Sequence, residues 1–128
     1  MPYVTTLTED DLDFGKRLTE RLKAERFPFR GVFWLYDDET DDWQLVVATD
    51  LVEKEGPRKT YLRLAKVTSS VAGSDFQLMR ISAINPRGPL YRALSSTFGK
   101  TASVLGARLR QTVVNGILIP EAYLYEIH

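Results

Sequence analysis

The chain has 128 residues, 44% of them hydrophobic, which is the usual size of one domain and enough to bury a stable core. It has no cysteine and a single histidine, His128 at the last position, so disulfides, cysteine nucleophiles, histidine-based triads and common zinc sites are not expected. The longest apolar run, Val32 to Tyr36, is too short to cross a bilayer, and the start is acidic where a signal peptide is basic. We therefore expect one soluble, cytoplasmic domain over residues 1–128 without membrane contact.

The formal net charge of zero conceals two oppositely charged parts of the chain. Residues 1–56 carry 14 acidic and 7 basic side chains, whereas residues 57–128 carry 3 acidic and 10 basic ones. The simpler interpretation is that the two parts interleave in one domain, so that their charges compensate on the surface. The alternative is a basic face that recognises an acidic partner.

A first helix is predicted to begin at Thr8, whose hydroxyl can cap it while Asp11 supplies the carboxylate of a capping box. Leu7 and Leu12 are spaced as a hydrophobic staple, and Pro28 is expected to stop the helix. The apolar residues that recur near the helical period are Leu12, Phe14, Leu18 and Leu22.

Two strands and a second helix are predicted next. The run Gly31 to Tyr36 is almost continuously apolar, as in a strand covered on both faces, and Trp43 to Thr49 is its expected antiparallel partner. The acidic stretch Asp37 to Asp42 between them is predicted to be a hairpin loop. Gly56-Pro57 is expected to begin the second helix, because proline suits the first helical position. Its predicted inner face consists of Tyr61, Leu64, Ala65 and Thr68, and it is expected to end within Ser69 to Asp75.

A third strand, Phe76 to Ile84, and a short third helix, Pro89 to Gly99, are predicted before the final part of the chain. The helix is expected to turn Leu90, Leu94 and Phe98 inward.

Val104 to Ile127 is predicted to form two strands joined at Asn115-Gly116, the strongest short hairpin signal. A two-residue turn there would place Arg110 opposite Glu121 as an ion pair, and Arg108 opposite Tyr123 as a cation–aromatic contact. The alternative is a second turn at Pro120-Glu121 followed by a separate final strand from Ala122 to Ile127, because proline disfavours a central strand.

This order of elements predicts an α+β fold. Hairpins at both ends supply antiparallel pairs, and the strand-helix-strand crossing in the middle permits a parallel pair. We expect a mixed, mainly antiparallel sheet of about five strands with three helices packed mainly on one face. The strand order cannot be predicted.

Three motifs resemble known sites but do not match them. Leu94 to Thr101 ends in the Gly-Lys-Thr of a phosphate-binding loop, yet Leu94 stands where that loop has glycine and a helix precedes it. The acidic stretch Asp37 to Asp42 lacks the spacing of a calcium loop. Asp50, Glu53, Lys54 and Glu55 resemble a nuclease set, but Glu53 and Lys54 are adjacent and would face opposite ways on a strand. We therefore predict no catalytic residues, no metal site and no cofactor.

Two basic features are weak candidates for binding. Arg87 and Gly88 lie in a proline-flanked turn just before a predicted helix, where free amides and the helix dipole favour an anion; the simpler interpretation is a rigid turn with a solvated arginine. On the second predicted helix, one face carries Lys59, Arg63 and Lys66, which could follow phosphates of a nucleic acid although no nucleic-acid motif accompanies them.

Four segments give the chain a resemblance to an uncharacterised family of short bacterial proteins of unknown function. The resemblance implies a free-standing bacterial protein and assigns no activity, cofactor or catalytic residue. The segments are Arg30 to Tyr36, Trp43 to Thr49, Glu55 to Arg58 and Val114 to Tyr125.

The leading functional hypothesis from the sequence is a small non-enzymatic protein–protein interaction module or homodimer. It would use a sheet edge or a surface containing Tyr123 and Tyr125 near the end of the chain. The second hypothesis is electrostatic nucleic-acid binding. The third is an enzyme that holds a small anionic substrate with Arg87 and uses Asp50 or Glu53 as base, although nothing in the sequence brings these residues together.

Overall fold

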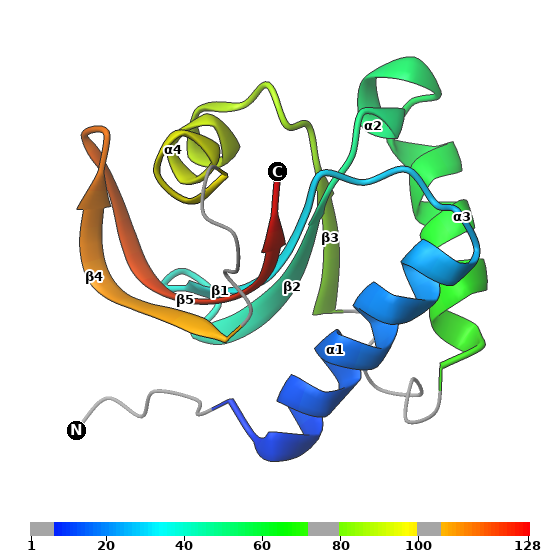
Figure 1. Ribbon diagram of the computed structural model, residues 1–128, viewed down its shortest axis with the longest axis horizontal. Coiled ribbons are helices and arrows are strands. Elements are labelled where there is room, and N and C mark those ends of the chain that lie inside the picture. The colour runs from blue at the N-terminus through cyan, green and yellow to red at the C-terminus, as the bar shows by residue number, and fades with distance from the viewer. Residues whose placement is uncertain (1–6, 72–79, 100–105) are drawn as a thin grey trace.

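The protein is an α+β structure built on one strongly curved five-stranded sheet (Figure 1). The computed structural model describes residues 7–71, 80–99 and 106–128. The strand order is β3-β2-β1-β5-β4, with β2 and β3 parallel and the other neighbours antiparallel, so the predicted mixed and mainly antiparallel sheet is confirmed. The strands are β1 Gly31–Asp37, β2 Asp42–Ala48, β3 Ile81–Ile84, β4 Ala107–Val114 and β5 Ile117–Ile127.

Helices α1 (Glu9–Ala24) and α3 (Pro57–Ser69) cover the convex face of the sheet (Figure 1). The predicted capping box of α1 is present: the amide of Asp11 donates to the Thr8 hydroxyl and the amide of Thr8 donates to the Asp11 carboxylate, both at 3.1 Å. The helix ends four residues before Pro28, because the chain reverses at Arg26 with φ of 55°.

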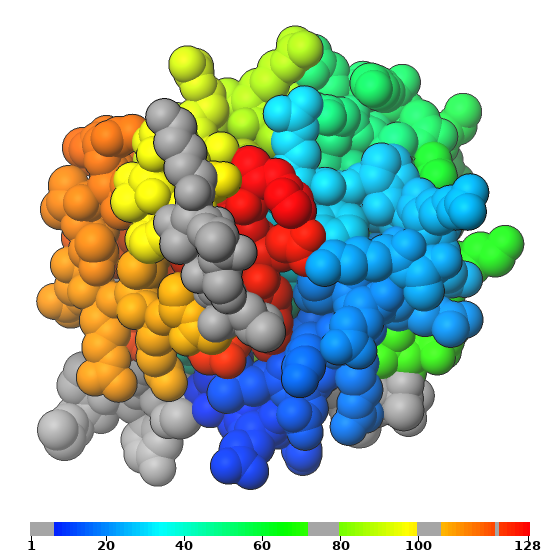
Figure 2. All heavy atoms as spheres, in the orientation of Figure 1, coloured from blue at the N-terminus to red at the C-terminus, as the bar shows by residue number. Residues whose placement is uncertain are grey.

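Helix α4 (Pro89–Phe98) lies on the concave side, where β5 and β4 curl around it (Figure 1). Figure 2 shows the end of β5, in red, between α4 in yellow and α1 in blue. A fourth, short helix, α2 (Leu51–Lys54), was not predicted and connects β2 to α3. The expectation that helices lie mainly on one face therefore holds for α1 and α3, and α4 is the exception.

Two cores explain the almost continuously apolar sequence of β1. Side chains of a strand alternate between faces, so Val32 and Trp34 enter the convex core while Phe33 enters the concave core. All three are fully buried. The β1–β2 hairpin pairs Gly31 with Ala48 at one end and Asp37 with Asp42 at the other, as expected for a strand pair closed by the acidic loop.

The hairpin of β4 and β5 turns at Asn115-Gly116, where both residues have positive φ, 48° and 78°. Arg110 faces Glu121 and Arg108 faces Tyr123, so the predicted register is confirmed. Neither the ion pair nor the cation–aromatic contact forms between these described side chains.

The alternative turn at Pro120 is wrong, since β5 continues through this residue. Proline is tolerated there because β1 pairs with β5 only from Ala122 onward, which leaves position 120 without a partner on that side. On the other side, Gln111 of β4 has φ of 40°, and β4 and β5 keep the same register before and after it, with Arg110 opposite Glu121 and Thr112 opposite Ile119.

Two other predictions need correction or fall partly outside the described residues. Tyr61 is not on the inner face of α3 but 41% exposed, and the buried residues of this helix are Thr60, Leu64, Val67 and Thr68. Of the predicted strand from Phe76, residues 76–79 lie outside the described part, and the observed strand is Ile81–Ile84.

Candidate anion-binding pocket

A pocket of about 550 Å³ opens where α4, the turn before it and the segment leading into β1 meet. Its wall contains three guanidinium groups that the sequence separates by up to 62 positions. The basic and polar residues that line it are Arg30, Arg87, Tyr91, Arg92, Ser95 and Ser96.

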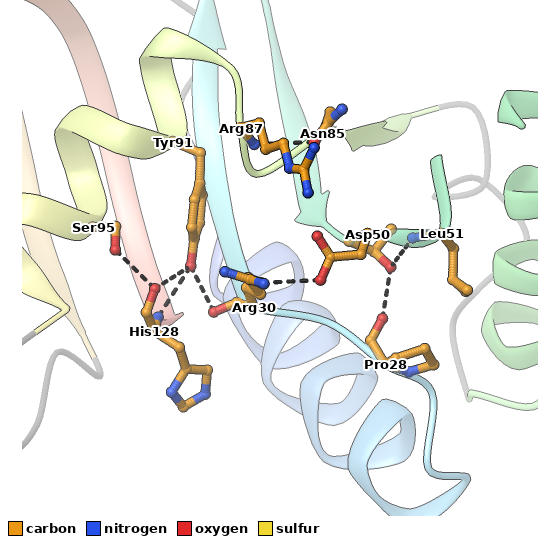
Figure 3. Close-up of polar contacts among 10 residues, drawn as sticks. Pro28, Arg30, Asp50, Leu51, Asn85, Arg87, Tyr91, Ser95 and His128 are labelled. Carbon is orange, nitrogen blue, oxygen red and sulfur yellow. Dashed lines mark hydrogen bonds and ion pairs between the residues drawn. The ribbon is translucent and has the colours of Figure 1, made fainter. Parts of the chain in front are cut away.

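The turn before α4 places Arg87 at this pocket. The Asn85 side-chain oxygen accepts from the Arg87 amide at 3.0 Å (Figure 3). The Asn85 carbonyl accepts from the Gly88 amide, also at 3.0 Å. The Gly88 amide is therefore occupied within the turn, and Pro89 has no amide hydrogen. Of the two predicted anion-binding residues, Arg87 lines the pocket, whereas Gly88 contributes only to the shape of the turn.

Two carboxylates from one short segment hold two of the arginines. Asp50, which precedes α2, lies 3.1 Å from Nε of Arg30, and Glu53 within α2 lies 3.2 Å from a terminal nitrogen of Arg87. Figure 3 shows Asp50 pointing at the Arg30 side chain beside Arg87. The structure thus brings together Arg87, Asp50 and Glu53, the residues of the third hypothesis, which no sequence pattern connected.

Tyr91 holds the wall of the pocket in place from the protein interior. Its ring is buried, its hydroxyl lies 2.7 Å from the Arg30 carbonyl, and it accepts from the His128 amide at 3.0 Å. Burial raises the pKa of Tyr91. A side chain on Gly31 would stand 2.6 Å from the Tyr91 ring, so a residue without Cβ is needed for this approach. Tyr91 was not among the residues predicted from the sequence, although its spacing to Leu94 and Phe98 is helical.

The guanidinium groups are the hydrogen-bond donors that remain for a ligand. The hydroxyl of Ser95 donates to the His128 carbonyl at 2.9 Å, and that of Ser96 donates to the Ala93 carbonyl at 3.0 Å. Arg92 is exposed and forms no ion pair with any described side chain. Among the described side chains, two carboxylates pair with two of the three guanidinium groups, and the positive charge of Arg92 remains without an acidic partner.

The other basic candidate, on α3, lies on the far side of the sheet. Lys59, Arg63 and Lys66 are exposed on one helix face, as predicted. Arg63 is engaged, since it lies 2.6 Å from a Glu55 oxygen and its guanidinium stands 5.7 Å from the centre of the Phe27 ring. This pairing reduces the positive charge that could follow a phosphate backbone.

The two tyrosines expected at a partner surface have mainly internal roles. Tyr125 is 5% exposed; its hydroxyl accepts from Nε1 of Trp34 at 3.0 Å and donates to the Leu12 carbonyl at 2.7 Å. Tyr123 is half-buried, with its ring centre 5.3 Å from that of Tyr125. The prediction failed for Tyr125 because this ring shares the convex face of β5 with Tyr123, and α1 packs over it: an added Cβ on Gly15 would meet the Tyr125 hydroxyl.

The two oppositely charged parts of the chain interleave. Arg80 lies 2.8 Å from an Asp11 oxygen and 3.7 Å from an Asp42 oxygen, and its guanidinium stacks 4.7 Å from the Trp34 ring centre. Together with Arg63–Glu55 and Arg87–Glu53, these pairs join basic residues of the second part to acidic residues of the first. This arrangement supports compensation of the charges at these positions.

Comparisons with protein-family models, with curated proteins and with solved structures give no match for this chain. In the described ranges, no group of three or more histidine or acidic side chains is placed to hold a metal ion. Among the helices that the structure describes, none is long and apolar enough to cross a membrane. Only the geometry of the pocket therefore identifies it as a candidate site.

Proposed function

We propose that this protein binds a small organic anion in the pocket beside α4. The observation that carries the proposal is the convergence of Arg30 with Arg87 and Arg92, from two segments far apart in the sequence, on one pocket of about 550 Å³. Small-molecule sites usually have volumes of about 300 to 1,000 Å³, so the pocket suits an organic molecule with an anionic group.

The donor groups suit this role. A guanidinium group has five N–H donors in a planar fork that matches carboxylate, phosphate and sulfonate oxygens. Arg30 uses its Nε for Asp50, and Arg87 uses one terminal nitrogen for Glu53, so both keep other donors. Charge-assisted hydrogen bonds of this kind are roughly twice as strong as neutral ones.

The proposal concerns binding and includes no reaction. Asp50 and Glu53 pair with Arg30 and Arg87 and are not among the residues that line the pocket, so we assign neither of them the role of a base. The described wall supplies no histidine or cysteine, and its serine hydroxyls donate to main-chain oxygens.

Calorimetric titration with benzenesulfonate and with phenyl phosphate at low salt tests the proposal. We expect saturable binding of at least one probe, and about tenfold weaker binding by Arg92→Gln, which removes a charge-assisted contact. Arg108→Gln is the matched control, because Arg108 lies on an edge strand whose neighbouring residues Ala107 and Leu109 pack on the α4 side, so its own side chain points the other way. No saturable binding of either probe, or equal weakening by the two variants, would contradict the proposal.

A second candidate function is self-association or binding of another protein through the β4–β5 hairpin. Val113 and Leu118 are paired across this hairpin and are 65% and 61% exposed, which supports an apolar contact. Pairing at the sheet edges is less favoured: the Ala83 amide of β3 donates to the Tyr61 hydroxyl at 3.0 Å, and β4 carries two arginines and a residue with positive φ, Gln111. Sedimentation analysis of the wild type and of Leu118→Lys tests this second candidate. If the hairpin mediates self-association, the wild type forms a dimer and the substitution dissociates it.

A further inference from the structure

On the basis of the proposed function, we infer that the pocket selects organic anions with a single negative charge over those with two. The selecting groups are Asp50 and Glu53, which compensate two of the three guanidinium charges. The class of ligand is therefore a carboxylate, sulfonate or phosphodiester, and a phosphate monoester is disfavoured.

The two carboxylates are a fixed part of the site. Asp50 and Glu53 are three residues apart at the start of α2, which brings their side chains to the same side of this short segment. The neighbouring Thr49 anchors the segment, since its hydroxyl donates to the Pro28 carbonyl at 2.7 Å and accepts from the Leu51 amide at 3.2 Å. Leu51 is buried in the convex core. The carboxylates cannot move away with α2 without disturbing this anchor.

Charge balance gives these carboxylates their effect on selectivity. A ligand with one negative charge neutralises the positive charge of Arg92, which has no acidic partner among the described side chains. A second negative charge finds no uncompensated guanidinium among the described groups, and it is repelled by the two carboxylates a few ångströms behind Arg30 and Arg87. A doubly charged ligand also loses more hydration on entering the pocket. Three arginines without the carboxylates would favour the doubly charged ligand instead.

Two probes of similar size separate these cases. Benzenesulfonate and phenyl phosphate share a phenyl ring and a tetrahedral head with three terminal oxygens, and they differ by the one ester oxygen that joins ring and head in phenyl phosphate. At pH 8 the sulfonate has one negative charge and the phosphate has two, because the second phosphate pKa is about 6. Titration of both into the wild-type protein and into Asp50→Asn/Glu53→Gln measures the charge preference with little change in shape.

We expect the wild type to bind benzenesulfonate at least as tightly as phenyl phosphate, and the double variant to reverse this order. Removing two negative charges near the site should change the ratio of the two affinities by about tenfold, since the effect scales with ligand charge. Asp38→Asn/Glu39→Gln is the control with the same change in net charge, because the β1–β2 loop lies at the other end of this hairpin from Asp50.

The outcomes distinguish this inference from the proposed function. Binding of both probes with a preference for phenyl phosphate in the wild type would overturn the inference and leave anion binding intact. An unchanged ratio in the double variant, or the same change in the loop control, would also overturn it. Binding of neither probe would overturn the proposed function itself. Circular dichroism of each variant establishes that the protein is folded.

Discussion

The convex and concave faces of the sheet use polar groups in opposite ways. On the convex face, Trp34, Tyr125 and the Leu12 carbonyl form a closed chain of hydrogen bonds, and Arg80 is held against Trp34 by acidic residues. Beside α4 on the concave face, Arg92 has no acidic partner among the described side chains, and the ion pairs of Arg30 and Arg87 are exposed.

This difference indicates which polar residues maintain the fold and which are available to a ligand. A buried donor without a partner costs about 1 to 3 kcal/mol, so the closed network of the convex face is required for stability. An exposed ion pair contributes only about 0 to 1 kcal/mol, so the arginines of the pocket can exchange a partner for a ligand with little loss of stability. Substitutions on the two faces should therefore separate stability from binding.

The largest expected effect is that of Trp34→Ala on the convex face. Trp34 is fully buried, and its removal leaves a cavity and deprives the Tyr125 hydroxyl of its donor. We expect a loss of about 3 to 5 kcal/mol in the free energy of unfolding, measured by urea denaturation. Probe binding should survive in the fraction that remains folded. Loss of binding in a variant of unchanged stability would contradict the division between the faces.

Gly31→Ala should affect both stability and binding. The new Cβ would lie 2.6 Å from the Tyr91 ring and 3.0 Å from the Glu126 carbonyl, so Tyr91 and the Arg30 segment must shift. We expect a loss of roughly 1 to 3 kcal/mol in stability, as for other overpacked sites, together with weaker binding of benzenesulfonate. Gly15→Ala is the matched control: its Cβ would meet the Tyr125 hydroxyl on the convex face, so it should lower stability alone. Equal effects of both variants on binding would show that the pocket does not depend on Tyr91.

Gly116→Val tests a turn that belongs to neither core. Gly116 has φ of 78° and no atom within 4 Å of the position of an added Cβ, so the cost comes from backbone strain alone. We expect a loss of roughly 1 to 3 kcal/mol, seen as a melting temperature lower by several degrees. Gly116→Asn should cost less, because asparagine tolerates positive φ. A Val variant that melts with the wild type would show that the turn relaxes.

The smallest expected effect is a loss of folding stability at alkaline pH. It involves tyrosines on both faces of the sheet. Burial raises the pKa of Tyr91 and of Tyr125, and a hydrogen bond to Asp41 raises that of Tyr36 to about 12. A raised pKa means that the neutral form is favoured in the folded state. Stability is therefore complete below the unfolded value of about 10 and falls as the pH rises above it. Urea denaturation between pH 8 and 11 measures this fall.

Tyr125→Phe provides the comparison for the alkaline measurement. It removes one of the buried hydroxyls, so its stability should depend less steeply on pH above 10 than that of the wild type. Parallel curves for the two proteins would show that Tyr125 does not contribute.

Local physical chemistry made much of the fold predictable from the sequence. The capping box at Thr8, proline at the first position of α3 and α4, and positive φ at Asn115-Gly116 each depend on neighbouring residues only. The continuous apolar run of β1 correctly indicated a strand covered on both faces. Short-range preferences of this kind operate before the chain has a tertiary structure.

The pocket was decided by the tertiary structure. Arg30, Arg87 and Arg92 meet because β1 lies at the centre of the sheet while α4 packs on its concave side, and a sequence pattern carries no information about such distant neighbours. The same holds for Tyr125, which is buried because α1 packs over its ring. Strand order and register depend on the burial of whole faces, so they fix the distances between remote side chains only when the complete sheet has formed.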